Sequence, residues 1–369
     1  MEDANMKVRK TLEELLNADG EIGLQVAACL DGKLVIDTWA GLADETSGRP
    51  VDGETLFTCF SISKGILATC IHVLADRGLI DYDTPIASYW PEFAAGRKEK
   101  ATIRHALTHR AGIPNDPPDF DIAMMTDWDR VCRATAAMEA LWTPGARISY
   151  HPLTYGWILG ELIRRVDGRS VARFLHDEIC LPLKITAMHM GLPPEDEGRV
   201  ANLRNAPGLT DLLSGYGIPA GHPMIDLAGV FNRHDVRRSI IPGAGLIANA
   251  RSLAQHYAML ANSGELNGTR ILSKERTEIS SKPEPEDPES SDVRWWNGHS
   301  LGYTLGGGSG PRSFLPYSFG YEGPGIIAFA DPKMNFSFAF LKNYIDLSAR
   351  EMDAATAVLD SVVKTLYIG

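Results

Sequence analysis

A serine followed three positions later by a lysine is the pattern in this chain that is best suited to chemistry. Ser61 and Lys64 stand at the start of a helix-like run, and residues three apart share one face of a helix, so the amine is expected beside the hydroxyl. A desolvated amine with a lowered pKa can activate a hydroxyl as a nucleophile. The helix N-terminus would also favour negative charge that develops at Ser61.

The same spacing occurs a second time, at Ser361 and Lys364, within an amphipathic pattern near the end of the chain. A lysine on a solvated helix face is the simplest interpretation of this second copy. The first copy has a different setting, because it follows a strand-like segment, 56–60, and precedes a long helical region. We therefore expect Ser61 and Lys64 to form the functional pair.

The elements that must position this pair are strands at both ends of the chain and helices between them. Two strand-like runs, 23–30 and 33–41, are joined by Asp31-Gly32, which is typical of a two-residue hairpin turn. The later strand-like runs lie at 302–306, 318–321, 325–330 and 336–341. Helical patterns at the start of the chain and at 347–366 are expected to pack on the shared sheet.

We predict an α+β fold, with an antiparallel sheet flanked by N- and C-terminal helices and with an inserted all-α domain. Residues 1–60 and 239–369 would form the sheet domain, and residues 61–238 the mainly helical domain. Ser61 falls at their junction, and clefts between domains often hold substrates, so the active site is expected there. A polar, proline-rich stretch, 283–291, is predicted to be a mobile surface loop.

The composition limits the classes of function. The chain has 369 residues, 44% of them hydrophobic and 22% charged, as in soluble globular proteins. A net charge of −11 without an evident basic patch argues against nucleic acids and anionic membranes as partners. Five scattered cysteines form no Cys-x-x-Cys pair, so we expect buried free thiols and no metal or other cofactor. The start lacks a signal-peptide pattern, which favours a cytoplasmic location.

A series of segments in a fixed order gives the pair a context. They lie at 60–65, 102–114, 144–150, 155–161, 242–246 and 249–254. Together they resemble the serine β-lactamase/penicillin-binding-protein superfamily, in its class C-like esterase and acyltransferase branch. The resemblance implies a β-lactamase/transpeptidase-like fold and an acyl-enzyme formed on Ser61. It also implies that Lys64 keeps Ser61 and Tyr150 in the required protonation states, and that Tyr150 passes the Ser61 proton to the leaving group. His109, in the second segment, would be mostly structural.

Two motifs depart from the pattern of that superfamily. Tyr150 is followed by His151 and Pro152, where β-lactamases have Tyr-x-Asn. Segment 321–323 reads Tyr-Glu-Gly, where β-lactamases have Lys-Thr-Gly and the esterases His-x-Gly or Trp-x-Gly. The missing basic residue and the added acidic one argue against efficient β-lactam turnover. The residues predicted to bind substrate are His151, Tyr321, Glu322 and Gly323.

A third departure concerns the oxyanion hole. In the superfamily the residue after the last motif glycine donates its backbone N–H to this hole, but here that residue is Pro324, which has no N–H. Losing one such donor typically costs about 10²–10³ in kcat. Three explanations are open: Gly325 donates instead, Tyr321 or another hydroxyl substitutes, or the protein does not run ordinary hydrolysis.

The leading hypothesis is a serine acyl hydrolase (esterase) or acyltransferase acting on a small or medium, largely apolar ester or thioester. Aromatic residues available for such a pocket are Trp128, Trp142, Trp157, Trp295, Trp296 and Phe314. An alternative is a natural-product lyase, isomerase or cyclase that reuses Ser61, Lys64 and Tyr150 as acid–base groups. A second alternative is a non-catalytic binding protein. The partner in each case would be a small molecule, and the oligomeric state is open.

Overall fold

The computed structural model describes residues 1–18, 20–285, 298–308 and 310–367. The stretch predicted to be a mobile loop, 283–291, lies outside the described residues from position 286 onward.

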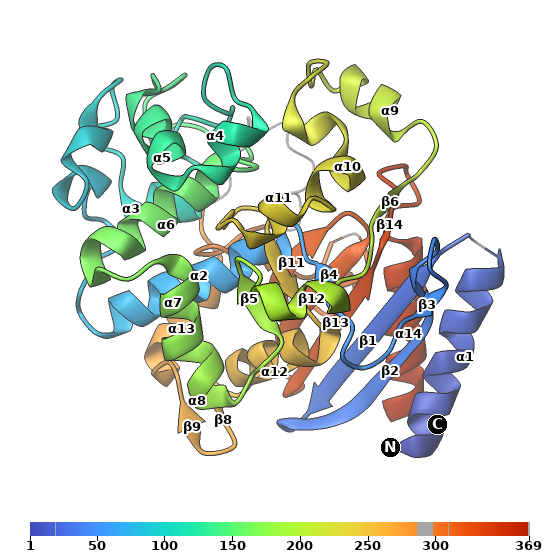
Figure 1. Cartoon of the computed structure of the whole chain (residues 1–369). Coiled ribbons are helices and arrows are strands. Elements are labelled where there is room, and N and C mark those ends of the chain that lie inside the picture. Colours follow the sequence, from blue (N-terminus) through green and yellow to red (C-terminus); the bar gives the residue numbers. More distant parts are fainter. Residues whose placement is uncertain (19, 286–297, 309, 368–369) are drawn as a thin grey trace.

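The main sheet is antiparallel and joins strands from both ends of the chain, in the order β10-β11-β12-β13-β1-β2-β3 (Figure 1). Its strands are β1 (Gly23–Leu30), β2 (Lys33–Asp44), β3 (Arg49–Pro50), β10 (Thr304–Leu305), β11 (Phe319–Gly323), β12 (Ile326–Asp331) and β13 (Phe336–Lys342). The predicted hairpin turn is confirmed, since Asp31 and Gly32 have φ values of 50° and 71°, as a turn of this type requires.

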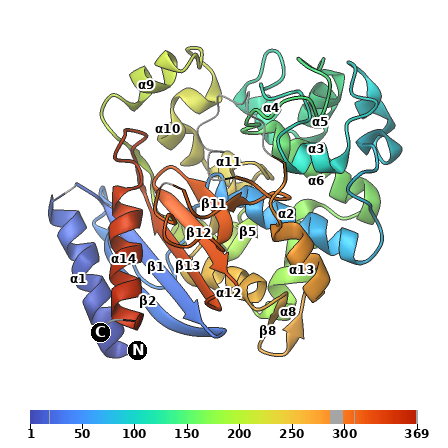
Figure 2. The same ribbon diagram turned by 180° about the vertical axis from the view of Figure 1, so that it is seen from behind.

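Two terminal helices cover one face of this sheet. α1 (Glu2–Ala18) and α14 (Asp353–Tyr367) lie side by side on it, as Figures 1 and 2 show from opposite sides. Val8 and Leu12 of α1 and Val358 of α14 are fully buried against strand residues such as Phe338. α12 (Ala250–Ala261) packs on β1, β12 and β13 from the other face. The predicted sheet flanked by terminal helices is confirmed.

The middle of the chain is mainly helical. Its helices are α2 (Ile62–Asp76), α3 (Ile103–Leu107), α4 (Ile122–Thr126), α5 (Trp128–Ala137), α6 (Thr154–Asp167), α7 (Val171–Leu175), α8 (Leu181–Leu183), α9 (Leu209–Gly215), α10 (Leu227–Phe231) and α11 (His234–Arg238), and α13 (Lys274–Ser281) follows later. Short strands pair separately: β4 (Phe57–Thr58) and β5 (Met188–Met190) with β7 (Leu246–Ala248), β6 (Arg204–Asn205) with β14 (Tyr344–Ile345), and β8 (Glu265–Leu266) with β9 (Thr269–Arg270).

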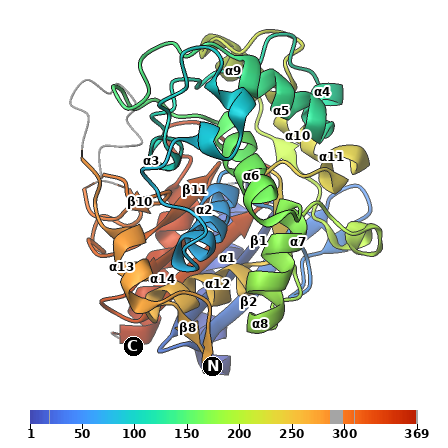
Figure 3. The ribbon, with the colours of Figure 1, turned by 90° about the vertical axis from the view of Figure 1, so that its left-hand side faces the viewer.

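Helix α2 links the sheet to the helical region. Every residue from Ile62 to Ala75 is buried, which is the pattern of a helix enclosed on all sides. It packs against α6 and against β11, and these elements meet near the middle of Figure 3. The division into a sheet domain (1–60 and 239–369) and a helical domain (61–238) stays a prediction. Helix α2 contacts elements of both predicted parts, α6 and β11.

Candidate active site

The backbone presents Ser61 at a sharp turn between β4 and α2. Phe60 has a φ of 41°, a strained value for an aromatic residue, and its ring packs edge-on against Phe231 at 5.3 Å between centroids. Ser61 stands at the N-cap of α2, but its side chain makes no capping hydrogen bond. A serine at this position usually bonds to a backbone N–H in the first turn. Here the hydroxyl is directed to other partners.

The three predicted catalytic residues are brought together around Ser61 Oγ. Lys64 Nζ donates to Ser61 Oγ at 3.1 Å and to the Gly243 carbonyl at 2.6 Å. Tyr150 Oη lies 2.6 Å from Ser61 Oγ, and Lys64 Nζ lies 4.8 Å from the centre of the Tyr150 ring. Lys64 is fully buried, whereas Ser61 and Tyr150 are partly exposed. Solvent can therefore reach the Ser61 hydroxyl, while the Lys64 side chain is shielded from it.

Ser63 is a supporting residue that the sequence analysis missed. It is fully buried, its hydroxyl donates to the Phe60 carbonyl, and it accepts from the Leu246 backbone N–H at 3.0 Å. These bonds tie the turn that carries Ser61 to strand β7. The only signal in the sequence was the position of Ser63 inside the Ser-x-x-Lys motif.

The Gly243 carbonyl is positioned by a close approach of α6. A Cβ placed on Gly156 would lie 2.2 Å from the Gly243 nitrogen, so only glycine fits there. This contact sets the carbonyl that accepts from Lys64. It also explains why a glycine stands in segment 155–161, one of the segments that carry the superfamily resemblance.

Replacing Gly156 by alanine is expected to lower the free energy of unfolding by about 1–3 kcal/mol, because the added methyl group overpacks this contact. The shift of Gly243 should also weaken its bond to Lys64 and lower activity. Thermal denaturation and ester hydrolysis would measure both effects. Gly215→Ala is the matched control, since nothing lies within 4 Å of a Cβ at that site. Equal stability of the two variants would contradict the prediction.

The Tyr-Glu-Gly segment, 321–323, lies at the end of β11, and its side chains divide between the two faces of the sheet. Tyr321 is 3% exposed and faces α2, where its Cβ lies 3.5 Å from a Cβ built on Gly65. Glu322 points to the opposite face, as successive strand residues do, and pairs with buried Arg312 at 2.5 Å. This geometry favours a structural role for Glu322 over the predicted substrate contact. The negative charge of Glu322 therefore points away from the Ser61 side, so it is not an argument against binding the carboxylate of a β-lactam there.

Gly323 ends the strand against the turn that precedes the nucleophile. A Cβ on Gly323 would lie 3.3 Å from the Cβ of Phe60, so the strand end and the turn are in close contact. Of the predicted substrate contacts, Tyr321 and Gly323 are thus the two that the structure brings to the Ser61 side of the sheet.

His151 occupies a buried structural position. It is 1% exposed, its Nδ1 donates to the Ser149 carbonyl at 2.6 Å, and its Nε2 accepts from the Ile113 backbone N–H at 3.2 Å. Burial lowers the pKa of His151 to about 4, so the ring is neutral near pH 7. With both nitrogens engaged by the backbone, this histidine holds the loop around Tyr150, which the geometry favours over the predicted contact with substrate.

The position of Pro324 bears on the oxyanion hole. Pro324 and Gly325 form the turn between β11 and β12, and Gly325 has a φ of 68°. The Gly325 N–H donates to Glu351 Oε1 at 3.4 Å, which does not favour the explanation that Gly325 replaces the missing donor. In the described part of the chain, no residue accepts a hydrogen bond from the Ser61 N–H. That group is the backbone donor available to an oxyanion.

The second Ser-x-x-Lys copy lies far from this arrangement in the fold. Ser361 is on α14, and its hydroxyl pairs with the Thr11 hydroxyl of α1 at 2.8 Å. This bond joins the two terminal helices. Ser361 thus has a packing role, and Lys364 is exposed, as expected of a lysine on a solvated helix face.

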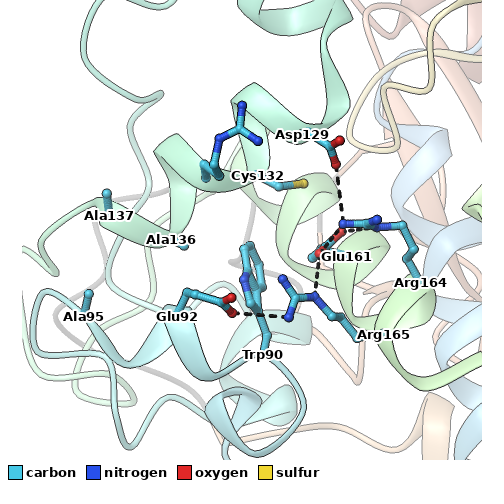
Figure 4. Close-up of a pocket in the computed structure, with 11 residues that line it drawn as sticks. Trp90, Glu92, Ala95, Asp129, Cys132, Ala136, Ala137, Glu161, Arg164 and Arg165 are labelled. Carbon is cyan, nitrogen blue, oxygen red and sulfur yellow. Dashed lines mark hydrogen bonds and ion pairs between the residues drawn. The ribbon is translucent and has the colours of Figure 1, made fainter. Parts of the chain in front are cut away.

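A separate pocket of about 480 Å³ lies beside α5, α6 and the turn around Glu92, and Figure 4 shows its lining. None of Ser61, Lys64 and Tyr150 lines it. Several of its charges pair with one another: the Glu161 carboxylate accepts from Arg164 and Arg165 at 2.7–2.8 Å. We interpret this cluster as a tie within the helical region.

The aromatic residues suggested for a substrate pocket serve largely other purposes. Trp157 is fully buried in the core, and Trp128 Nε1 donates to Glu161 at 2.9 Å. Phe314 is 46% exposed. Trp295 and Trp296 lie outside the described residues.

The described residues include no group of three or more His, Cys, Asp or Glu side chains that is arranged to hold a metal ion. All five cysteines are free and buried. Within the described parts of the chain, every helix is too short or too polar to span a bilayer.

Three buried histidines predict how stability depends on pH. Burial lowers the pKa of His72 and of His256 to about 3, and that of His151 to about 4. The unfolded chain takes up these protons near pH 6.5 and the folded chain does not, so acid favours unfolding. Each histidine is expected to lower the free energy of unfolding by up to about 1.4 kcal/mol per pH unit as the pH falls from about 6.5 to about 4.

Calorimetry at intervals between pH 8 and pH 5 would measure this effect. The melting temperature should stay level above pH 7 and fall steeply between pH 6.5 and pH 5, where ordinary carboxylates are still ionised. A melting temperature that is unchanged between pH 7 and pH 5 would contradict the assignment of these rings as neutral and buried.

Comparison with known proteins shows to which family a chain with this arrangement belongs. A family model described as Beta-lactamase matches residues 8–362. The chain belongs to the β-lactamase family. As a member of the serine β-lactamase/penicillin-binding-protein superfamily, it is a serine hydrolase of the β-lactamase-like type, and the predicted fold is confirmed.

Three relatives of this β-lactamase family member show how far the likeness extends. "Esterase/beta-lactamase LipL" of Mycobacterium tuberculosis is 33% identical over 345 residues, which cover 87% of this chain and 77% of that protein. The crystal structure of a family VIII carboxylesterase has a TM-score of 0.87 and 30% identity, with 98% of each chain covered. A penicillin-binding protein homologue from Caulobacter crescentus has a TM-score of 0.85 and 29% identity, over 99% of this chain and 98% of that one.

Proposed function

We propose that this protein is a serine esterase that forms an acyl-enzyme on Ser61 with a small or medium, largely apolar ester or thioester. The observation that carries the proposal is the contact of Ser61 Oγ with both Lys64 Nζ, at 3.1 Å, and Tyr150 Oη, at 2.6 Å. The names of LipL and of the family VIII carboxylesterase support ester substrates.

The proposed acylation step follows from these contacts. The step begins with Tyr150 as a phenolate. Ser61 Oγ accepts from Lys64, so its own hydrogen passes to Tyr150 Oη as Oγ attacks the carbonyl carbon, and Tyr150 becomes a neutral phenol. The Oγ–C bond forms and the C–O bond to the leaving group breaks, and Tyr150 gives the proton to the departing oxygen. Water would then release the acyl group. The buried ammonium of Lys64 would stabilise the negative charge that Tyr150 carries before it takes the Ser61 proton and again after it gives that proton to the departing oxygen.

Incubation with p-nitrophenyl butyrate, followed by intact-protein and peptide mass spectrometry, tests the proposal. We expect p-nitrophenolate release with an initial burst and an added butyryl group on the peptide that contains Ser61. Turnover without any adduct on that peptide under rapid acid quench would argue against a covalent mechanism at Ser61.

Acyl transfer is the second candidate, because it shares the acylation of Ser61 with hydrolysis and differs only in the group that accepts the acyl chain. Pro324 leaves the tetrahedral intermediate with one backbone donor, so attack on the acyl-enzyme is expected to be slow for water and for an alcohol alike. An alcohol that binds in the site could then compete with water. Adding a primary alcohol to the butyrate assay and measuring the new ester by chromatography would separate transfer from hydrolysis.

A further inference from the structure

We infer that Tyr321 donates a hydrogen bond to the leaving-group oxygen, and that His109 is the positioning residue that directs it there. This inference rests on the proposed function, because it assigns a residue to the acylation step on Ser61. The observations behind it are the contacts of a buried pair, His109 and Tyr321, that lies beside Tyr150.

The protonation state of His109 is fixed by its neighbours. The backbone N–H of His151 donates to His109 Nδ1 at 3.0 Å, and a backbone nitrogen can only donate, so Nδ1 carries no hydrogen. In the neutral ring the hydrogen is then on Nε2. His109 Nε2 lies 3.0 Å from Tyr321 Oη, so it donates and the phenol oxygen accepts. His109 is therefore not placed to act as a base.

The direction of this bond orients Tyr321. Since its oxygen accepts from His109, its own hydrogen must point to another acceptor. The His109 ring lies 4.9 Å from the Tyr150 ring, and Lys64 Nζ lies 4.8 Å from the centre of the Tyr150 ring and 5.9 Å from that of Tyr321. Both phenols thus flank the same ammonium. Because the Tyr321 hydroxyl contacts His109 and the His109 ring lies against that of Tyr150, the hydroxyl is brought to the Tyr150 side of the site.

This arrangement places a neutral hydrogen-bond donor, Tyr321, beside Tyr150, the residue that carries the proton. As the C–O bond of an ester breaks, negative charge grows on the departing oxygen, which receives the proton from Tyr150. A hydrogen bond from Tyr321 to that oxygen stabilises the charge, and the Tyr321 proton stays on Tyr321. This help matters most for a poor leaving group such as an alkoxide and little for p-nitrophenolate, which leaves without it.

The test measures kcat/KM of the wild type and of Tyr321→Phe on two esters of the same acid, p-nitrophenyl butyrate and ethyl butyrate. Loss of a hydrogen bond to a charged group is expected to lower kcat/KM for ethyl butyrate by about 10- to 100-fold more than for the p-nitrophenyl ester. Tyr317→Phe removes an exposed phenol, 62% accessible, from the segment just before β11 and should change neither rate. Equal losses on the two esters would overturn the role of Tyr321.

His109→Asn tests the positioning role. The φ of His109 is 57°, a region in which asparagine is tolerated, and the shorter side chain loses the bond to Tyr321. We expect the same dependence on leaving group, smaller in size, and no further loss when this change is added to Tyr321→Phe. Additive losses would overturn the coupling. If the wild type forms no butyryl adduct on Ser61, the proposed function itself fails, which is a separate outcome.

Discussion

Replacement of Ser61 by alanine is expected to lower kcat for ester hydrolysis by about 10⁴- to 10⁶-fold, the range found when the nucleophile of a serine hydrolase is removed. The change deletes the atom that both Lys64 and Tyr150 contact. It should also abolish the butyryl adduct in the mass spectrum. Stability should change little, because the Ser61 side chain is partly exposed and caps no helix nitrogen.

The second Ser-x-x-Lys copy provides a matched control. Ser361→Ala removes the same atom from the same local pattern, but there the hydroxyl bonds to Thr11 on a neighbouring helix. Activity should be unchanged, with a small loss of stability of about 0.5–1.5 kcal/mol. Full activity of the Ser61→Ala protein would remove the basis of the covalent mechanism.

Replacement of Lys64 by methionine is expected to separate activity from stability. Methionine has a similar length but cannot donate to Ser61 Oγ, so kcat/KM should fall by about 10²–10⁴-fold, the usual value of acid–base assistance. The variant no longer buries a charge, which offsets the loss of the bond to Gly243. Its melting temperature should therefore stay within a few degrees of the wild type.

Lys98→Met is the control, because Lys98 is equally buried but serves the backbone. Its Nζ donates to the carbonyls of Ala95 at 2.6 Å, Ala136 at 3.1 Å and Met138. Removing it leaves these acceptors without their donor, so we expect a loss of about 1–3 kcal/mol in stability and little change in activity. If Lys64→Met were instead the less stable and more active of the two, the assigned roles would be reversed.

Much of the fold could be predicted from local sequence patterns. The alternating runs of the first hairpin and its Asp31-Gly32 turn depend on near neighbours, so the sequence determines them directly. The nucleophile helix and the strands after residue 302 were also found. Helix ends are harder to predict: α3 ends at Leu107, and His109 takes a positive φ that no local propensity predicts.

The site could be predicted only in part, because its geometry depends on contacts between distant segments. The pairing of Ser61 with Tyr150 came from the family pattern. That Glu322 faces away from Ser61 depends on the register of β11, and that His151 is held by the backbone depends on how its loop folds. The strained Phe60 and the approach of α6 to Gly243 left almost no local signal, since only the completed packing requires them.

The position of β1 between β2 and β13 has a consequence for how the protein is made. The ribosome completes the first hairpin long before it reaches β13, so the β1 edge of that hairpin stays open during most of synthesis. An unpaired strand edge is prone to join other chains, and pairings between segments far apart in sequence form slowly. We therefore expect the nascent chain to depend on chaperones, and soluble yield to rise when synthesis is slowed by low temperature.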